Sequence, residues 1–357
     1  MTNQSVTTLP QRNWGPRIQD LLLRDMRLII LENELLRVGV LAGKGTDIVE
    51  LNYKPRDLDL AWLSAHGVQN PAALGSAYRD SLATFLDSYP GGWQEIFPNG
   101  GAPSVFDGAA YGQHDEVFAL PWRVDIVEDT TESIAVRFTV RTHKVPCLIE
   151  KTMRLTSGVP QLRFEERLLN TGAVPVRAMW GHHITFGPPF LRPGCRIRLP
   201  DGVTGLPHET SIAPGGRRVA NADHFAWPDA TGEDGTSVDL SIIPERGTAS
   251  EIVYISGFAD HHGWYEIDDP DTRIGSRVEW DARQMPYLWY WQEFGATTGY
   301  PWYGRNYNIG LEPFSSYPTN GLAEAVANGS ALTLEPGEAR DFWLTMTILD
   351  PHDGGAA

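Results

Sequence analysis

The stretch SIAVRFTVRT, residues 133–142, decides the fold class. Apolar and other side chains alternate along it, so that Ile134, Val136, Phe138 and Val140 fall on one face of an extended chain. Successive side chains of a β-strand point to opposite sides of the sheet, so this alternation predicts a strand with one buried face.

Three other regions carry a strand signal. Residues 26–40, MRLIILENELLRVGV, hold two apolar runs on either side of a short polar segment, which predicts a hairpin. Residues 148–172 predict two strands joined by Ser157-Gly158. Residues 332–349 predict a final hairpin across Pro336-Gly337.

Helical signal is confined to residues 70–85, where Pro71 suits the first position of a helix. The chain also has 36 Gly and 26 Pro, which indicates many turns between short strands. We therefore expect an all-β protein, built from large, mostly antiparallel stacked sheets with few short helices.

Length, charge and cysteine usage limit the class of protein. The 357 residues suit one large β domain over 1–357, with a core from about 25 to 349. The net charge of −16 argues against nucleic acid and anionic membranes as partners. No run approaches the roughly 18 apolar residues of a membrane span, and the first residues lack a secretory pattern. Cys147 and Cys195 have no metal-site spacing. We expect a cytoplasmic monomer or homodimer.

Aromatic residues, histidines and turns gather in three segments: residues 89–122, 180–190 and 280–317. In a sheet protein, segments far apart in the sequence can meet on one face. The first segment holds Trp93 followed by Gln94 and Glu95, and the third holds Trp291. An aromatic ring beside polar groups suits a sugar, whose apolar face stacks on the ring while its hydroxyls bind the polar groups. A structural tryptophan in a polar loop is the alternative.

The second segment contains two adjacent histidines, His182 and His183, within MWGHHITFG. Strand alternation places one on each face of a sheet. A histidine with an ordinary pKa near about 6.5 can exchange a proton at neutral pH, so one of the pair is a candidate acid or base. A packed histidine beside a surface histidine is the alternative. No paired i, i+4 histidines indicate a metal site.

The third segment contains Glu312 between Ile309-Gly310-Leu311 and Pro313-Phe314. A carboxylate among apolar neighbours is desolvated, which raises its pKa and makes it a better base near neutral pH. A structural Glu312 paired with Arg305 is the alternative. Arg305 could instead reach a phosphate or carboxylate of a substrate.

Four segments, taken in order, resemble the aldose 1-epimerase (galactose mutarotase-like) superfamily. They are LENELLRVGVLAGKGTDIVELNYK near the N-terminus, HDEVFALPW around His114, NTGAVPVRAMWGHHITF around His183, and IGLEPFSSYP around Glu312. The resemblance spans about residues 25–349 and selects His183 over His182. The chain departs from the family pattern at Asp115, which stands where glycine is usual, and at Gly181-His182, which replaces asparagine before the histidine.

The resemblance implies a β-supersandwich and an isomerase that interconverts the α and β anomers of a free or lightly modified sugar. It implies Glu312 as general base, His183 as general acid and His114 as a sugar-binding residue. Such an enzyme needs no metal or nucleotide cofactor. Composition alone adds Trp93 and Trp291 as stacking residues and Arg305 as a further binding candidate.

Two other functions remain open from the sequence. A lyase or hydrolase could use the same architecture, and a hydrolase would need a second carboxylate beside Glu312, for which Glu95, Asp115 and Glu116 are candidates. A non-catalytic sugar-binding protein would keep the aromatic cleft without needing Glu312 and His183 at one ligand.

Overall fold

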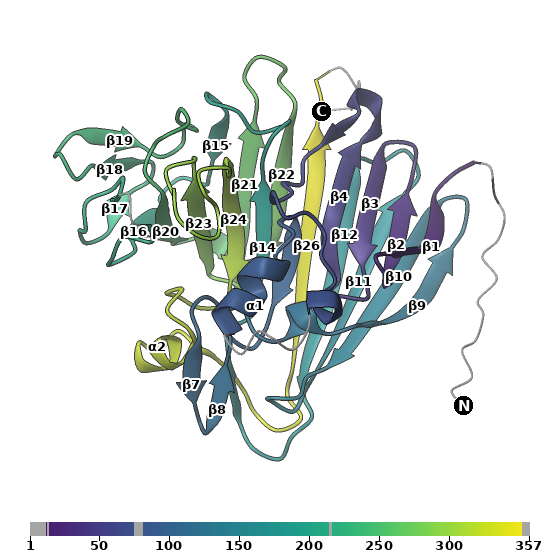
Figure 1. Cartoon of the computed structure of the whole chain (residues 1–357). Helices are drawn as coiled ribbons and strands as arrows, with labels where there is room; N and C mark the ends of the chain where they lie inside the picture. The colour runs from purple at the N-terminus through teal and green to yellow at the C-terminus, as the bar shows by residue number, and fades with distance from the viewer. Residues whose placement is uncertain (1–11, 13, 75–80, 214–215, 352–357) are drawn as a thin grey trace.

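Two large antiparallel sheets stack face to face in the computed structural model, which describes residues 12, 14–74, 81–213 and 216–351 (Figure 1). The larger sheet has twelve strands, in the order β1 (Arg17–Leu23), β2 (Met26–Glu32), β3 (Leu36–Leu41), β4 (Asp47–Tyr53), β6 (Trp93–Ile96), β14 (Gly181–Phe186), β24 (Asn308–Phe314), β23 (Tyr287–Glu293), β20 (Glu251–Ser256), β16 (Thr204–Pro207) and β17 (Phe225–Ala226), with β5 (Leu58–Asp59) beside β4. The all-β prediction is confirmed.

The smaller sheet has eight strands and lies behind the larger one in Figure 1. Its order is β15 (Arg196–Arg198), β21 (His262–Asp268), β22 (Gly275–Asp281), β26 (Ala339–Leu349), β12 (Gln161–Asn170), β11 (Cys147–Thr156), β10 (Ser133–Arg141) and β9 (Arg123–Asp129). Three two-stranded sheets complete the strands: β7 (Ser104–Phe106) with β8 (Ala109–Tyr111), β13 (Val176–Ala178) with β25 (Leu332–Leu334), and β18 (Asp229–Thr231) with β19 (Ser237–Asp239).

The core lies between the two large sheets. Ile134, Val136 and Phe138 on β10 are fully buried and Val140 is 6% exposed, so the alternation of this strand is confirmed. Burying one such side chain contributes about 1.5–3 kcal/mol. The inner face of the smaller sheet therefore forms half of the core, and its outer face carries the polar residues of the alternation.

Two of the three predicted hairpins are confirmed. β2 pairs with β3, and β11 pairs with β12. The predicted hairpin over residues 332–349 is wrong, because β25 pairs with β13 while β26 pairs with β12 and β22. β26 is flanked on both edges within the smaller sheet, so no edge is free for β25. The residues Pro336-Gly337 determine only that the chain turns there. The partners of β25 and β26 depend on the apolar area that each strand buries against other parts of the protein.

Helices are few and short. The predicted helix over 70–85 is replaced in part by a 3₁₀ turn, η2 (Pro71–Leu74), and by α1 (Ser81–Ser88), while residues 75–80 lie outside the described part. The other helical elements are η1 (Lys54–Arg56), η3 (Val117–Ala119), η4 (Ala259–His261) and α2 (Leu322–Ala327). Among the described residues, none of these helices could span a membrane.

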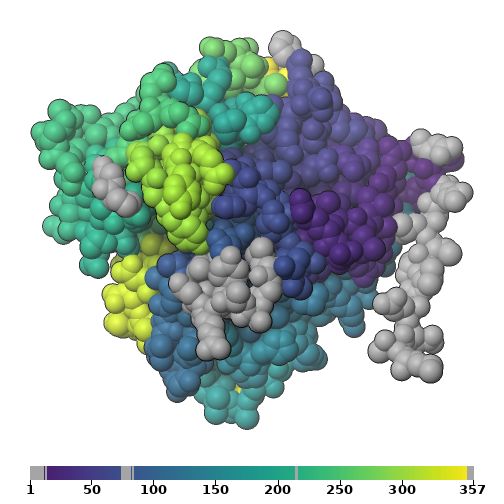
Figure 2. All heavy atoms as spheres, in the orientation of Figure 1, coloured from purple at the N-terminus to yellow at the C-terminus, as the bar shows by residue number. Residues whose placement is uncertain are grey.

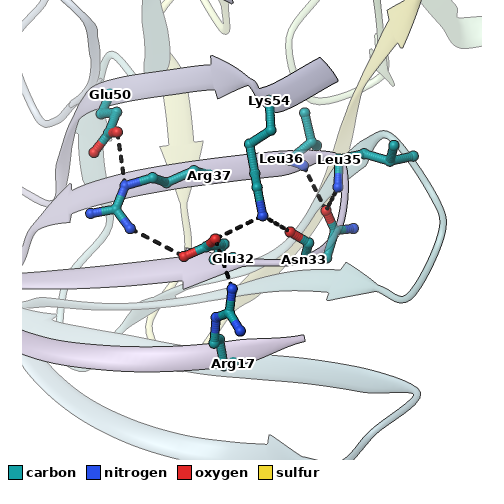
Figure 3. Close-up of polar contacts among 8 residues, drawn as sticks. All are labelled: Arg17, Glu32, Asn33, Leu35, Leu36, Arg37, Glu50 and Lys54. Atoms are coloured by element: carbon teal, nitrogen blue, oxygen red, sulfur yellow. Dashed lines mark hydrogen bonds and ion pairs between the residues drawn. The ribbon is translucent and has the colours of Figure 1, made fainter. Parts of the chain in front are cut away.

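An ion-pair cluster fixes the N-terminal edge of the larger sheet (Figure 3). Glu32 on β2 accepts hydrogen bonds from Arg17, Arg37 and Lys54 at 3.1, 3.1 and 2.7 Å. Burial alone would raise the pKa of Glu32, but the bonds from Lys54 and Arg17 hold it below its ordinary value. Next to it, the side chain of Asn33 donates to two carbonyls of the β11–β12 turn and so joins the two sheets.

Candidate active site

A row of side chains crosses the face of the larger sheet that points away from the smaller one. The strand registers place His183 on β14 opposite Gln94 on β6, and Glu312 on β24 opposite Trp289 on β23. The β14–β24 pairs on either side of these positions bring His183 next to Glu312. Two residues 129 positions apart in the sequence are thus cross-strand neighbours, which is the closest side-chain relationship a sheet provides.

His182 points to the opposite face, into the layer between the sheets. Its Nδ1 accepts a hydrogen bond from Nε1–H of Trp93 at 3.0 Å, and its Nε2 lies 3.2 Å from a carboxylate oxygen of Glu166 on β12. Its ring stacks on Phe342 of β26. Since Nδ1 accepts, the neutral ring carries its proton on Nε2 and donates it to Glu166. The two adjacent histidines therefore have different environments, as strand alternation predicts.

The expected stacking role of Trp93 is wrong. Its side chain is 3% exposed and packs on Phe164 of β12, inside the core between the sheets. The reason is again the strand period: Gln94 faces outward on β6, so its neighbour Trp93 faces inward.

A cavity of about 200 Å³ lies over the row that contains His183 and Glu312. At roughly 30 Å³ per water molecule, it has room for a single small ligand. It is lined by Phe85, Leu86, Tyr89, Gln113, His114, His183, Ile212, Ile252, Trp289, Trp291, Trp302, Glu312 and Thr319.

Segments remote in the sequence build the wall of this cavity. α1 lies across the front of the larger sheet (Figure 1), and Figure 2 shows the yellow-green segment after β23 beside the blue segment around α1. Contacts join the two segments: Tyr300 Oη–H donates to Asp87 at 2.9 Å, and the rings of Trp302 and Tyr89 are 6.2 Å apart. The three aromatic segments singled out in the sequence meet here.

Four of the six candidate site residues line the cavity: His114, His183, Trp291 and Glu312. Arg305 does not line it. The Arg305 side chain is exposed, and its Nε–H donates to the carbonyl of Trp302 at 3.3 Å. The structure therefore gives no support to a contact between Arg305 and a substrate.

His183 and Glu312 touch each other inside the cavity. Nε2 of His183 lies 3.5 Å from Oε1 of Glu312, and their side chains are 7% and 2% exposed. Burial raises the pKa of Glu312 well above its ordinary value. Burial also lowers the pKa of His183 to about 3. Both shifts have one cause, since desolvation disfavours the charged form of either group.

Gly310 makes room for the catalytic candidate on its own strand. It lies two residues before Glu312 on the same face of β24, and a Cβ atom at Gly310 would lie 2.2 Å from Oε1 of Glu312. The Ile-Gly-Leu-Glu-Pro motif thus combines a carboxylate with the one residue type that lets it fold back over the strand.

His114 brings a second imidazole to the cavity. Its Nδ1 accepts a hydrogen bond from the backbone N–H of Gly101 at 3.1 Å, so the neutral ring carries its proton on Nε2. Burial, and then the neighbouring His183, lower the pKa of His114 well below its ordinary value. The ring lies against Phe85 and His183, with centroid distances of 4.8 and 5.3 Å. His114 is therefore a neutral hydrogen-bond donor.

The aromatic wall includes residues that the sequence did not identify. Trp302 and Tyr89 lie within the aromatic segments, so the clustering signal was present but did not single them out. Phe85 lies on α1 and has no distinguishing signal in the sequence. Trp291, half-buried, was identified; its ring is 5.7 Å from that of His183.

The alternative carboxylates lie elsewhere. Glu95 faces the core, where it forms a buried ion pair of 2.7 Å with Lys151. Asp115 pairs with Lys144, and Glu116 accepts hydrogen bonds from the backbone N–H groups of His143 and Lys144. Among the described lining residues, Glu312 alone carries a carboxylate and none is a lysine or an arginine. No group of three or more described His, Cys, Asp or Glu residues has the arrangement of a metal site.

Comparisons with known proteins identify the family and the fold of the chain. The family model described as a domain of unknown function, DUF4432, matches residues 24–348. The chain belongs to the DUF4432 family. No protein of curated function matches the chain.

Solved structures similar to this DUF4432 member share its fold at low sequence identity. A candidate aldose 1-epimerase from Klebsiella pneumoniae has a TM-score of 0.75 at 18% identity, over 96% of this chain and 86% of that one. A galactose mutarotase-like protein from Clostridium acetobutylicum has a TM-score of 0.65 at 14% identity, over 94% and 99%. The galactose mutarotase-like fold expected from the sequence is confirmed.

Proposed function

We propose that this DUF4432 protein is an aldose 1-epimerase-like isomerase that interconverts the α and β anomers of a free sugar. The observation that carries the proposal is the buried contact between His183 and Glu312 at the floor of a cavity with aromatic walls. The two oxygens that exchange protons in this reaction, the C1 hydroxyl and the ring oxygen, are bonded to the same carbon. An acid and a base that serve them must therefore lie close together.

The protonation state of Glu312 and His183 suits this chemistry. A raised pKa of Glu312 and a pKa of about 3 for His183 favour an uncharged pair, a carboxylic acid beside a neutral imidazole. The pair then holds one shared proton. Moving that proton across the 3.5 Å contact gives a carboxylate and an imidazolium.

From the charged form, every proton in the reaction is accounted for. Glu312 removes the proton of the C1 hydroxyl as the C1–O1 bond becomes a carbonyl. The bond between C1 and the ring oxygen breaks, and the Nε2 proton of His183 passes to that oxygen. The pair is left uncharged while the open-chain sugar rotates about C1–C2. Reversal of both transfers closes the ring on the other face and restores the charged pair. Each positioned acid or base contributes typically about 10²–10⁴-fold.

The residues that line the cavity also help to judge the hydrolase alternative and the charge of the substrate. A hydrolase of the usual kind needs two carboxylates beside the bond that it cleaves. The described lining residues include one carboxylate, that of Glu312. Aromatic rings such as Trp291 and Trp302 suit the apolar face of a sugar ring, while His114 offers a donor to a hydroxyl. The described lining has no lysine or arginine, which favours an uncharged sugar over a phosphate or a uronate.

Exchange NMR of anomer interconversion tests the proposal, with a panel of free hexoses, pentoses, uronic acids and sugar phosphates. The wild type is compared with Glu312→Gln and His183→Asn. Glu165→Gln, which removes an exposed carboxylate from the outer face of the smaller sheet, is the control. Acceleration of one sugar, lost in both site variants but kept in the control, supports the proposal.

Absence of acceleration for every sugar, with a folded wild type, would overturn it. The panel would then be repeated with oligosaccharides, to test for a lyase, a hydrolase or a binding protein.

A further inference from the structure

One buried asparagine joins three segments of the chain at the cavity. Asn99 follows β6 and is fully buried. Its side-chain amide nitrogen, Nδ2, donates to the carbonyl of Ala102 at 3.0 Å and to the carbonyl of Gly112 at 2.8 Å. Its Oδ1 accepts a hydrogen bond from the backbone N–H of Leu322 at 2.7 Å. The side chain therefore uses both of its donors and its acceptor on the backbone of three different segments.

These segments carry the polar residues of the cavity wall. Outside the acid–base pair and the aromatic residues, three polar residues are among the described lining residues: Gln113, His114 and Thr319. We call them the polar side of the cavity. Gln113 and His114 directly follow Gly112, and Thr319 lies three residues before Leu322. The hydrogen bonds of Asn99 therefore reach the backbone beside every member of the polar side.

Gly101 connects this arrangement to the ring of His114. Its backbone N–H donates to Nδ1 of His114 at 3.1 Å, and its carbonyl accepts from the backbone N–H of His114 at 3.1 Å. Gly101 has a φ of +78°, and a Cβ atom there would lie 1.9 Å from the carbonyl oxygen of Thr319. The backbone N–H of Ala102 donates to that same oxygen at 2.8 Å. Only glycine, which has no Cβ atom, fits between the His114 and Thr319 segments at this distance.

We propose that Asn99 is a positioning residue for the polar side of the cavity, where it holds Gly101 against His114 and so keeps the proton of that ring on Nε2. It also holds Gln113 and Thr319 beside His114. Asn99 is not among the lining residues, so it acts through these three residues rather than on the sugar. The kind of ligand rests on the proposed function, whereas the joining of the three segments does not.

Binding and proton transfer then depend on different parts of the protein. His183 and Glu312 are held by β14 and β24 of the larger sheet, whereas the polar side is held by the loops that Asn99 joins. Loss of the Asn99 hydrogen bonds should weaken sugar binding while the acid–base pair keeps its geometry. A higher KM with a nearly constant kcat is the kinetic form of such a loss.

Asn99→Ser tests the inference, because the shorter side chain cannot span the three partners. Asn33→Ser is the matched control: Asn33 is 2% exposed, and its side chain also bonds two backbone carbonyls and backbone N–H groups, but at the N-terminal edge of the larger sheet (Figure 3). For the panel sugar that the wild type accelerates most, KM should rise about tenfold or more in Asn99→Ser with kcat within about threefold, and neither should change in Asn33→Ser. Asn99→Asp keeps the shape, and its buried carboxyl, once protonated, keeps one donor and the acceptor, so its KM should be intermediate.

The ring of His114 reports the same arrangement without any substrate. Protein labelled with ¹⁵N-histidine gives a ¹H–¹⁵N multiple-bond spectrum in which protonated and unprotonated ring nitrogens differ strongly. The His114 signals among the ten histidines are assigned by their loss in His114→Gln. We expect a bare Nδ1 and a protonated Nε2 in the wild type and in Asn33→Ser, and a mixture of both tautomers in Asn99→Ser. A proton on Nδ1 of His114 in the wild type would overturn the inference.

The outcomes separate this inference from the proposed function. An unchanged KM or unchanged His114 signals in a folded Asn99→Ser would overturn the inference even if the wild type accelerates anomer exchange, and so would a fall in kcat at constant KM. Loss of folding in both Asn99 variants, with a folded Asn33→Ser, would show that Asn99 holds the fold rather than the cavity and would also overturn it. If the wild type accelerates no sugar, the proposed function fails alone, and the His114 signals in Asn99→Ser then decide the inference.

Discussion

Replacing Glu312 with glutamine should make the protein more stable, and increasingly so as the pH rises. Glu312 is 2% exposed and faces a neutral histidine rather than a cation. Its carboxyl group is therefore held in an environment that disfavours its ionisation. Glutamine has nearly the same shape and cannot ionise, so the variant removes this cost and keeps the packing.

The sign follows from the raised pKa of Glu312 in the folded protein. Above the ordinary value of 4.5, the unfolded chain releases this proton while the folded chain keeps it. The wild type thus loses about 1.4 kcal/mol of stability for each pH unit between 4.5 and the folded-state pKa, whereas Glu312→Gln does not. Below pH 4.5 the carboxyl is protonated in both states, so the two proteins should be nearly equal.

Thermal unfolding measures this difference directly. A change of 1 kcal/mol corresponds to about 2 °C in Tm for a large domain, so the Tm of Glu312→Gln should rise relative to the wild type by about 3 °C per pH unit. His183, whose pKa is lowered, is present in both proteins, so its own acid sensitivity largely cancels. Glu165→Gln shows the effect of losing an exposed carboxylate.

A Tm difference that stays constant between pH 4.5 and 8 would refute the reasoning. So would a Glu312→Gln variant that becomes progressively less stable than the wild type as the pH rises. Either result would mean that the ionised Glu312 is well paired in the folded protein, and that it is not the desolvated base of the proposed reaction.

Four more predictions concern the same structure. Lys151→Met should lose about 3–5 kcal/mol in denaturant unfolding because it leaves the buried Glu95 without its cation, and adding Glu95→Gln should restore much of the loss. Since the pKa of His183 is about 3, anomer exchange corrected for the uncatalysed reaction should keep most of its rate at pH 5, where an ordinary histidine would be mostly charged; a loss centred near 6.5 would contradict this. Gly310→Ala should lower kcat by about 100-fold, since the new Cβ displaces the Glu312 carboxylate, with an unchanged circular dichroism spectrum as the check on folding. Sugar phosphates and uronates should show kcat/KM at least about tenfold below that of the matching neutral sugar, because the described lining residues include no lysine or arginine to pair with the added negative charge; equal values would refute this.

Much of the fold could be predicted from the alternation of apolar and polar residues along the strands. The alternation at Ile134, Val136 and Phe138 is a local property, because side-chain direction along a strand depends only on position. The same period separates His182 from His183. It would also have excluded Trp93 once Gln94 was placed on the cavity face, but which face holds the cavity is not a local property.

The partners of β25 and β26 could not be predicted from the sequence, for a physical reason. The turn at Pro336-Gly337 indicated a hairpin, yet β25 and β26 join different sheets. Pairing is decided by the apolar area that each strand buries against distant neighbours, and local turn chemistry specifies only where the chain changes direction.

The sequence by itself determined the strand content, the aromatic segments and the residue types of an acid–base pair. Only the tertiary structure decided that His183 and Glu312 touch, because their contact depends on the register of β14 against β24. It also decided that Tyr89 and Trp302 line the same cavity, which no spacing in the sequence indicates. The physical reason is that a cross-strand contact depends on which strands pair, and only folding brings β14 beside β24.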